Sequence, residues 1–137
     1  MRYLIDTNVF TRMVNESDLF SGNVKSIIED YENILYVSSE SVKEYIHLVQ
    51  NKKITLKKGF DLSNIFDLIE NNLGLIVKYV SKEHLRKFAM LDLVEGHNDP
   101  SDRLIIAQAL TEKMPLISSD AKFPKYRKQG LDLITNH

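Results

Sequence analysis

The sequence contains no cysteine and no tryptophan, and it has only three prolines and five glycines among 137 residues. Without cysteine the chain forms neither disulfides nor thiolate metal sites, so a reducing compartment is compatible with it. Its apolar runs are all too short to cross a bilayer, and its first residues do not resemble a signal peptide. We therefore expect a soluble cytoplasmic protein with no membrane association.

The sequence also lacks an excess of charge of either sign. Eighteen lysines and arginines stand against nineteen aspartates and glutamates, which leaves a net charge of −1. This balance excludes the broad basic field of a general nucleic-acid-binding protein. Affinity for a polyanion must then come from a local basic patch or from a bound cation. The hydrophobic fraction of 43% fits one globular domain, and we expect residues 1–137 to form it.

Short apolar segments alternate with amphipathic segments along the chain. Strands are predicted over residues 3–5, 34–37, 75–80, 116–117 and 131–134. Apolar residues at helical spacing predict helices between them: one capped by Asn23, one over 41–50, one starting at Asp61, one from Ser81 to near Gly96, and one from 99 through 112. This alternation favours the α/β class, with three α/β/α layers and a short, mostly parallel central sheet of four to five strands.

The first predicted strand ends in Asp6, which is followed by Thr7 and Asn8. In an open α/β sheet, ligands collect at the carboxyl ends of the strands. An aspartate at a strand-to-helix turn is also a common N-cap of the helix that follows. On this stretch alone, the cap is the safer interpretation.

A second strand end has the same arrangement. The apolar pair at 116–117 is followed by Ser118, Ser119 and Asp120. Either aspartate alone could be a helix cap. Two strand ends in one small sheet that each place an aspartate beside a hydroxyl residue favour a shared site.

The start of the helix at 99–112 carries two further acids. Pro100 suits the first helical position, and Asp99 suits the N-cap before it. Asp102 aligns with Ile106 and Ala109 on the stripe that should face the sheet, so its carboxylate is expected to point inward. The alternative role for Asp102 is a first-turn acid that interacts with the helix dipole.

Glu44 is less clearly placed by the pattern. It lies opposite the apolar face of its helix, which is formed by Val42, Tyr45, Ile46 and Val49. This predicts exposure, either to bulk solvent or to a water-filled cleft at the sheet edge, and the spacing does not choose between them.

Basic residues follow Asp120, with Phe123 and Tyr126 among them. They are Lys122, Lys125, Arg127 and Lys128. The lysines could hold a phosphate backbone while the rings stack on unpaired bases. Alternatively, this is a solvated turn with both rings in the core, which is the commoner arrangement. The four histidines, His97 among them, show no zinc-ligand spacing.

Taken together, these motifs resemble the PIN domain, and most nearly the VapC-type toxins of bacterial toxin–antitoxin pairs. The resemblance covers essentially the whole chain, and its most specific part is the run DPSDRLIIAQA at 99–109. It implies four metal-binding catalytic acids, with Asp99 in support: Asp6, Glu44, Asp102 and Asp120. It also implies an endoribonuclease toxin that depends on Mg²⁺, with Mn²⁺ as a substitute. The implied partners are an RNA substrate, an antitoxin and a second copy of the chain in a homodimer.

Hydrolysis of a phosphodiester needs an activated water and relief of charge on the phosphate, which a hard cation held by carboxylates supplies. Two carboxylates about 4 Å apart repel by about 4 kcal/mol at an effective dielectric near 20, so acids gathered without an ion must take up protons or separate. We expect Thr7, Asn8 and Ser119 to orient the carboxylates or bound waters. Residues expected to contact the substrate are Arg103, Lys122 and Lys125.

Two other functions remain open at this point. Haloacid-dehalogenase-like phosphatases also begin with a strand that ends in a nucleophilic aspartate. They need a second aspartate two residues later, where this chain has Asn8. A non-catalytic PIN domain that binds RNA or protein is the other alternative, although such a domain has no physical reason to keep repelling carboxylates together.

Overall fold

The computed structural model describes residues 1–15 and 20–136. Five short strands form its central sheet: β1 (Arg2–Ile5), β2 (Ile34–Ser38), β3 (Ile76–Lys78), β4 (Leu116–Ser118) and β5 (Leu133–Thr135). Their order is β3-β2-β1-β4-β5, and each of the four pairings is parallel. The predicted α/β class and the short parallel sheet are confirmed.

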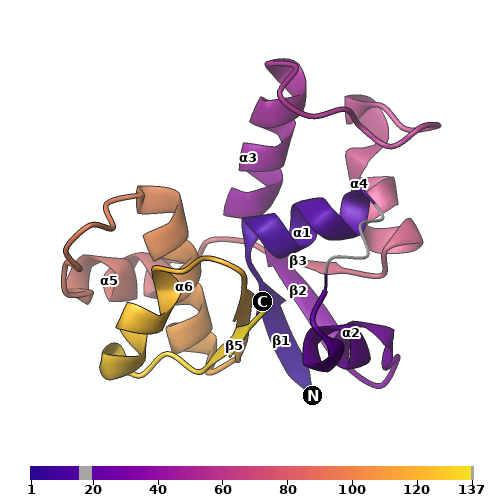
Figure 1. Ribbon diagram of the computed structural model, residues 1–137. Coiled ribbons are helices and arrows are strands. Elements are labelled where there is room, and N and C mark those ends of the chain that lie inside the picture. Colours follow the sequence, from indigo (N-terminus) through magenta and orange to yellow (C-terminus); the bar gives the residue numbers. More distant parts are fainter. Residues whose placement is uncertain (16–19, 137) are drawn as a thin grey trace.

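Helices cover both faces of this sheet (Figure 1). One side carries α1 (Thr7–Val14), α2 (Gly22–Glu29), α3 (Ser39–Gln50) and α4 (Ile65–Asp67), and the other carries α5 (Lys82–Met90) and α6 (Pro100–Glu112). Shorter turns of other helical types are η1 (Leu62–Asn64), η2 (Leu68–Asn72) and η3 (Phe123–Gln129). No helix in the described ranges is long and apolar enough to cross a membrane.

The alternation of side chains along β1 divides the apolar residues into two cores. Ile5 faces the first core, which contains Phe10 of α1 and Tyr45 of α3. Leu4 faces the second, which contains Ile105 of α6. Leu4 and Ile5 are both fully buried, as expected for a central parallel strand with helices on each face. The sheet is therefore held rigidly from both sides.

Several predicted helix boundaries are wrong. The helix assigned to an Asn23 cap starts two residues earlier than that cap implies, at Gly22, and Ser21 is its N-cap. The helix capped by Ser81 ends at Met90 rather than near Gly96, because Leu91 turns to an extended conformation.

The segment that starts at Asp61 changes helical type along its length. Asp61 does cap its start, where the Ser63 backbone N–H donates to the Asp61 carboxylate over 2.9 Å. The backbone then passes from a 3₁₀ turn to a short α-helix and a π-helix. The 3₁₀ helix η3, which holds Phe123 and Tyr126, was not predicted.

The topology places the candidate site. From β1 the chain moves through β2 to β3 on one side of the sheet, and β4 and β5 lie on the other side. The strand order therefore reverses between β1 and β4, and ligands of open α/β sheets bind in the crevice at such a point. Asp6 directly follows β1, and Asp120 follows β4 by two residues.

Candidate metal centre

Asp6 serves as a helix cap and as a buried acid at the same time. Its Oδ1 accepts a hydrogen bond of 2.8 Å from the Val9 backbone N–H, which caps α1. Its Oδ2 accepts one of 2.5 Å from the Ser118 hydroxyl at the end of β4. The side chain is thus fixed between two adjacent strand ends, and the residue is only 3% exposed. The two interpretations left open by the sequence are compatible.

Asp102 reaches the same crevice from the start of α6. Asp99 is the N-cap, and its Oδ1 accepts from the backbone N–H groups of Ser101 (2.9 Å) and Asp102 (3.2 Å). Pro100 occupies the first turn, as predicted. Asp102 follows on the half-buried side of that turn, and its Oδ2 lies 3.4 Å from His97 Nε2.

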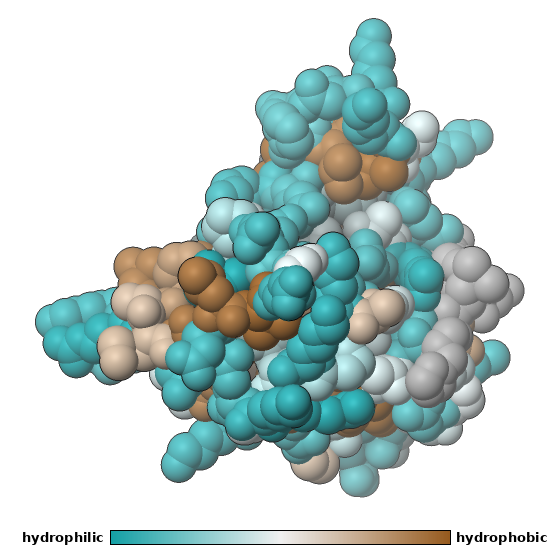
Figure 2. Space-filling view, turned by 60° about the vertical axis from the view of Figure 1, so that its left-hand side comes forward, coloured by the Kyte–Doolittle hydropathy of each residue, from teal (hydrophilic) through white to brown (hydrophobic). Residues whose placement is uncertain are grey.

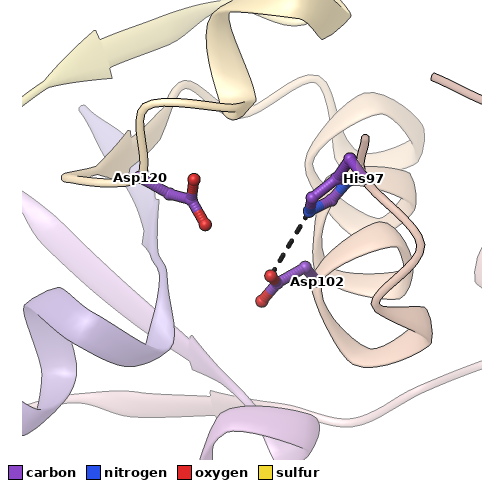
Figure 3. A group of neighbouring side chains, drawn as sticks. All are labelled: His97, Asp102 and Asp120. Carbon is purple, nitrogen blue, oxygen red and sulfur yellow. Dashed lines mark hydrogen bonds and ion pairs between the residues drawn. The ribbon is translucent and has the colours of Figure 1, made fainter. Parts of the chain in front are cut away.

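Asp120 completes the group from the turn after β4. Its Oδ1 accepts from the Lys122 backbone N–H over 2.8 Å, and its own N–H donates to the Ser118 hydroxyl over 3.0 Å. Figure 3 shows the carboxylates of Asp120 and Asp102 and the ring of His97 turned toward one space. One ligand atom from each of these three residues lies within 4.8 Å of the others.

The electrostatics show that the acids interact. Burial raises the pKa of Asp6 to about 6, the charges of Asp102 and Asp120 add to this rise, and the hydrogen bonds from Ser118 and Val9 oppose it. Burial likewise raises the pKa of Asp102 to about 6, with further contributions from the charges of Asp99 and Asp120 and an opposing one from His97. The charges of Asp102 and Asp120 therefore act on Asp6, although the three residues are distant in the sequence.

Glu44 lies on α3, close enough to Asp99 and Thr7 to interact with both. Burial raises its pKa, the charge of Asp99 raises it further, and a hydrogen bond with Thr7 lowers it. Its Oε2 atom is buried and finds no hydrogen-bond partner in residues 1–15 and 20–136. A buried carboxylate oxygen without a donor is unfavourable unless a cation or a water meets it. This oxygen and the neighbouring carboxylates fit a hard divalent ion.

The hydroxyl groups near the acids contact both carboxylates and other polar groups, and Thr7 bonds Glu44. Ser118, rather than Ser119, contacts a carboxylate. The Ser119 hydroxyl accepts from Arg12 Nη1 over 3.0 Å and from Asn136 Nδ2 over 3.4 Å. Thr7 Oγ1 donates to Ser41 over 2.9 Å, which ties α1 to α3.

Asn8 is exposed in the first turn of α1. Its expected role in orienting the carboxylates or bound waters stays a prediction.

The residues expected to contact substrate occupy three different settings. The Arg103 guanidinium is half-buried and lies 4.9 Å from the centroid of the Phe88 ring. Lys122 is exposed, and Lys125 Nζ approaches the Glu95 carbonyl at 3.4 Å. Their roles stay predictions.

The rings of Phe123 and Tyr126 are 1% and 0% exposed, so they belong to the core. Stacking of these rings on RNA bases is therefore wrong for this fold, and the interpretation that placed both rings in the core is confirmed.

Two residues of the site carry no signal in the sequence pattern. Arg12 lines a hollow of about 580 Å³ beside Asp120, together with Ser119, Thr135 and Asn136. His97 lies beside Asp102 and Asp120. Arg12 sits in the last turn of α1 and His97 between two helices, so neither belongs to a motif whose spacing indicates a ligand.

The raised pKa values predict how stability depends on pH when no divalent ion is bound. Asp6 and Asp102 have an ordinary pKa of 3.8 and a folded-state pKa of about 6. Between these values the native state binds more protons than the unfolded state, so stability falls as pH rises, and the loss is complete above about pH 6. We expect the loss to be about 1–3 kcal/mol between pH 4 and pH 7.

This expectation is checked by urea unfolding in EDTA across that pH range. The matched control is the Asp6→Asn, Asp102→Asn double variant, which lacks both titrating groups. An identical pH dependence in the two proteins would show that neither carboxyl has a raised pKa.

The chain matches one known protein family and is similar to several solved structures. Residues 3–129 match the model of the PIN domain family. VapBC2 from Rickettsia felis, bound to a DNA fragment from its promoter, aligns over 100% of both chains with a TM-score of 0.68 and 19% identity. DNA-bound VapBC from Salmonella typhimurium aligns over 98% of both chains with a TM-score of 0.67 and 14% identity. No curated protein sequence matches.

At these identities, the likeness to solved structures concerns the fold. The family match is independent of it and spans nearly the whole chain, including Asp6, Glu44, Asp102 and Asp120. The chain belongs to the PIN domain family.

Proposed function

We propose that this PIN domain is a Mg²⁺-dependent endoribonuclease that hydrolyses phosphodiester bonds in single-stranded or loop RNA by attack of an activated water. Mn²⁺ substitutes for Mg²⁺ in this proposal. The observation that supports it is the gathering of Asp6, Asp102 and Asp120 at the strand switch point, where two of the three have a pKa near 6. These acids and Glu44 would hold the ion.

A divalent ion, when bound, supplies the positive charge that activates the attacking water and offsets the charge of the phosphate. The chain's own contribution is to fix its ligands in advance. The Val9 N–H and Ser118 hydroxyl hold both oxygens of Asp6, and the Lys122 N–H holds one oxygen of Asp120. Such contacts behind the ligands orient them and support their affinity for the ion.

The hollow beside Asp120 is suited to the RNA backbone. It adjoins the acids, and its lining combines the Arg12 guanidinium with hydroxyl and amide groups. Arginine is well matched to phosphate oxygens because its planar group offers several donors. We propose that a phosphate next to the cleaved bond lies here. Lys122 and Lys125, which do not line this hollow, are proposed to contact the RNA beyond it.

Replacing Arg12 with glutamine is expected to weaken RNA binding about 10-fold or more, because a hydrogen bond to a charged group contributes about 1.5–3 kcal/mol. The plot of log affinity against log salt should become shallower by about 0.7, the loss of one phosphate contact on a single strand. Fluorescence anisotropy of a labelled oligonucleotide measures both, with Asp6→Asn present in every protein to prevent cutting. Arg86→Gln is the control, since Arg86 is exposed on α5 and pairs with Glu83. Equal RNA affinity in the two arginine variants would show that Arg12 does not contact the RNA.

Incubation of the purified chain with single-stranded RNA tests the function itself. Cleavage is expected with Mg²⁺ or Mn²⁺ and not with EDTA. Cutting that survives EDTA would contradict the proposal. A phosphoaspartate at Asp6 would instead support the phosphatase alternative, and RNA binding without cleavage under every metal condition would support a non-catalytic domain.

Protein partners form a second part of the proposal. Similar solved structures include VapBC complexes and FitAcB from Neisseria gonorrhoeae, and we propose that this chain is the toxin of a pair and is bound by an antitoxin. We also propose that it forms a homodimer. Large apolar side chains are exposed on and after α5, namely Leu85, Met90 and Leu93. Hydrophobic surface is visible on the side of the molecule that Figure 2 brings forward, and exposed apolar areas of this kind mark protein contacts.

A further inference from the structure

His97 is held rigidly against the acids although it belongs to neither of the neighbouring helices. The residue is 2% exposed. Its ring packs edge-on against Phe123 and Tyr126, with centroid distances of 5.7 and 5.3 Å. Because these rings belong to the core, the imidazole cannot turn without disturbing them. Its Nε2 atom therefore stays directed at the space between Asp102 and Asp120 (Figure 3).

The spacing between His97 and Asp102 is long for a hydrogen bond and also fits two ligands of one ion. Nε2 lies 3.4 Å from Asp102 Oδ2, whereas a charge-assisted N–H···O bond measures about 2.7–2.9 Å. Two donor atoms that are each about 2.1 Å from a shared ion lie about 3.0–3.4 Å apart for angles between 90° and 109°. The neighbouring oxygen of Asp120 is within the same 4.8 Å limit.

The other ring nitrogen lies beside a hydroxyl oxygen, which accepts from it in the tautomer that carries the proton on Nδ1. Nδ1 of His97 lies 2.6 Å from the Tyr126 hydroxyl oxygen. Histidine ligands almost always donate their second N–H to an oxygen, which fixes the tautomer and leaves the opposite lone pair for the ion. Tyr126 is fully buried and so holds this hydroxyl in place.

We propose that His97 Nε2 binds the divalent ion directly together with Asp102 and Asp120, which makes the centre a mixed nitrogen and oxygen site selective for Mn²⁺ over Mg²⁺. Mg²⁺ takes oxygen ligands, whereas imidazole nitrogen suits first-row transition metals. The inference rests on the proposed function, because it concerns the same ion.

Pulsed electron paramagnetic resonance of the Mn²⁺-loaded protein tests this without measuring cleavage. Wild type is expected to show ¹⁴N modulation from a coordinated imidazole, and His97→Gln is expected to lose it. The ratio of Mn²⁺ to Mg²⁺ affinity, measured by competition, should fall about 10-fold in that variant. The matched control is His84→Gln, since His84 is equally buried but bonds Glu112 instead.

Loss of the ¹⁴N signal only in His97→Gln supports the inference. Mn²⁺ binding without any ¹⁴N coupling in wild type overturns it and leaves the proposed nuclease intact. Coupling in a protein that does not cleave RNA supports the inference and contradicts the proposed nuclease. If His97→Gln does not fold, ¹⁵N-histidine spectra of wild type with Zn²⁺ identify the ligating ring. The His97 signals are assigned through the contacts of its ring with Phe123 and Tyr126. A ring that stays unshifted then overturns the inference.

Discussion

Replacing Asp6 with asparagine is expected to lower kcat/KM for RNA cleavage by at least about 100-fold and to stabilise the metal-free fold. The loss of activity follows from the loss of one charged ligand, since groups that only support a ligand already contribute 10–100-fold. The gain in stability has a separate cause. Asparagine keeps the carbonyl oxygen that accepts from the Val9 N–H, and its amide can donate to Ser118, but the buried charge is gone.

The gain should be on the order of 1–2 kcal/mol at neutral pH in EDTA, because a pKa raised from 3.8 to about 6 represents a penalty that the neutral side chain avoids. Urea unfolding measures it, and a cleavage assay with Mg²⁺ measures the activity. Asp132→Asn is the control, because Asp132 is exposed before β5 and away from the other acids. Unchanged cleavage would contradict the role of Asp6 as a metal ligand. A large loss of stability would show that the buried charge of Asp6 does not destabilise the metal-free fold.

Mg²⁺ is expected to raise the melting temperature of the wild type by several degrees. At a concentration 100 times its dissociation constant, an ion that binds only the native state adds about 2.7 kcal/mol. For a chain of this length, this corresponds to a shift of about 5–10 °C. The physical reason is that the ion meets carboxylates that otherwise repel one another in a partly buried crevice.

The Asp102→Asn, Asp120→Asn double variant should lose most of this shift. Glu29→Gln and Glu83→Gln serve as controls, since both side chains are exposed and pair with a basic residue of their own helix. Ionic strength is kept equal with a monovalent salt, which screens charge without binding. An equal Mg²⁺ shift in the double variant would mean that the ion binds elsewhere on the protein.

The parts of the fold that were predictable are those encoded by short local signals. Asp99 and Pro100 fix the start of α6, and the apolar run before Asp6 fixes β1. Parallel strand ends meet at one edge, so a pattern of aspartates after strands was enough to bring Asp6 and Asp120 together.

The rest depends on packing between distant segments. Whether Ser118 or Ser119 contacts Asp6 is decided by a difference of one residue at the end of β4. The direction of Glu44 depends on how α3 lies against α1, where Thr7 bonds Ser41. The π-turn near Leu73 likewise follows from an i to i+5 bond to Leu68, which apolar spacing does not reveal.

His97 was missed for a related reason. Its ring is oriented by Phe123 and Tyr126, which follow it by more than twenty residues in the sequence and lie in a helix that was not predicted. No spacing rule for metal ligands connects these positions.

Titration of ¹⁵N-labelled protein with substoichiometric Mn²⁺ shows which segments surround the bound ion, because a bound paramagnetic ion broadens the amide signals of the residues around it. We propose that carboxylates from four distant segments bind one divalent ion. The signals of residues 6–9, 43–45, 97–103 and 118–122 are then expected to broaden together, while those of α2 stay sharp. Broadening of only one of these segments, or of none at saturating Mn²⁺, would contradict it.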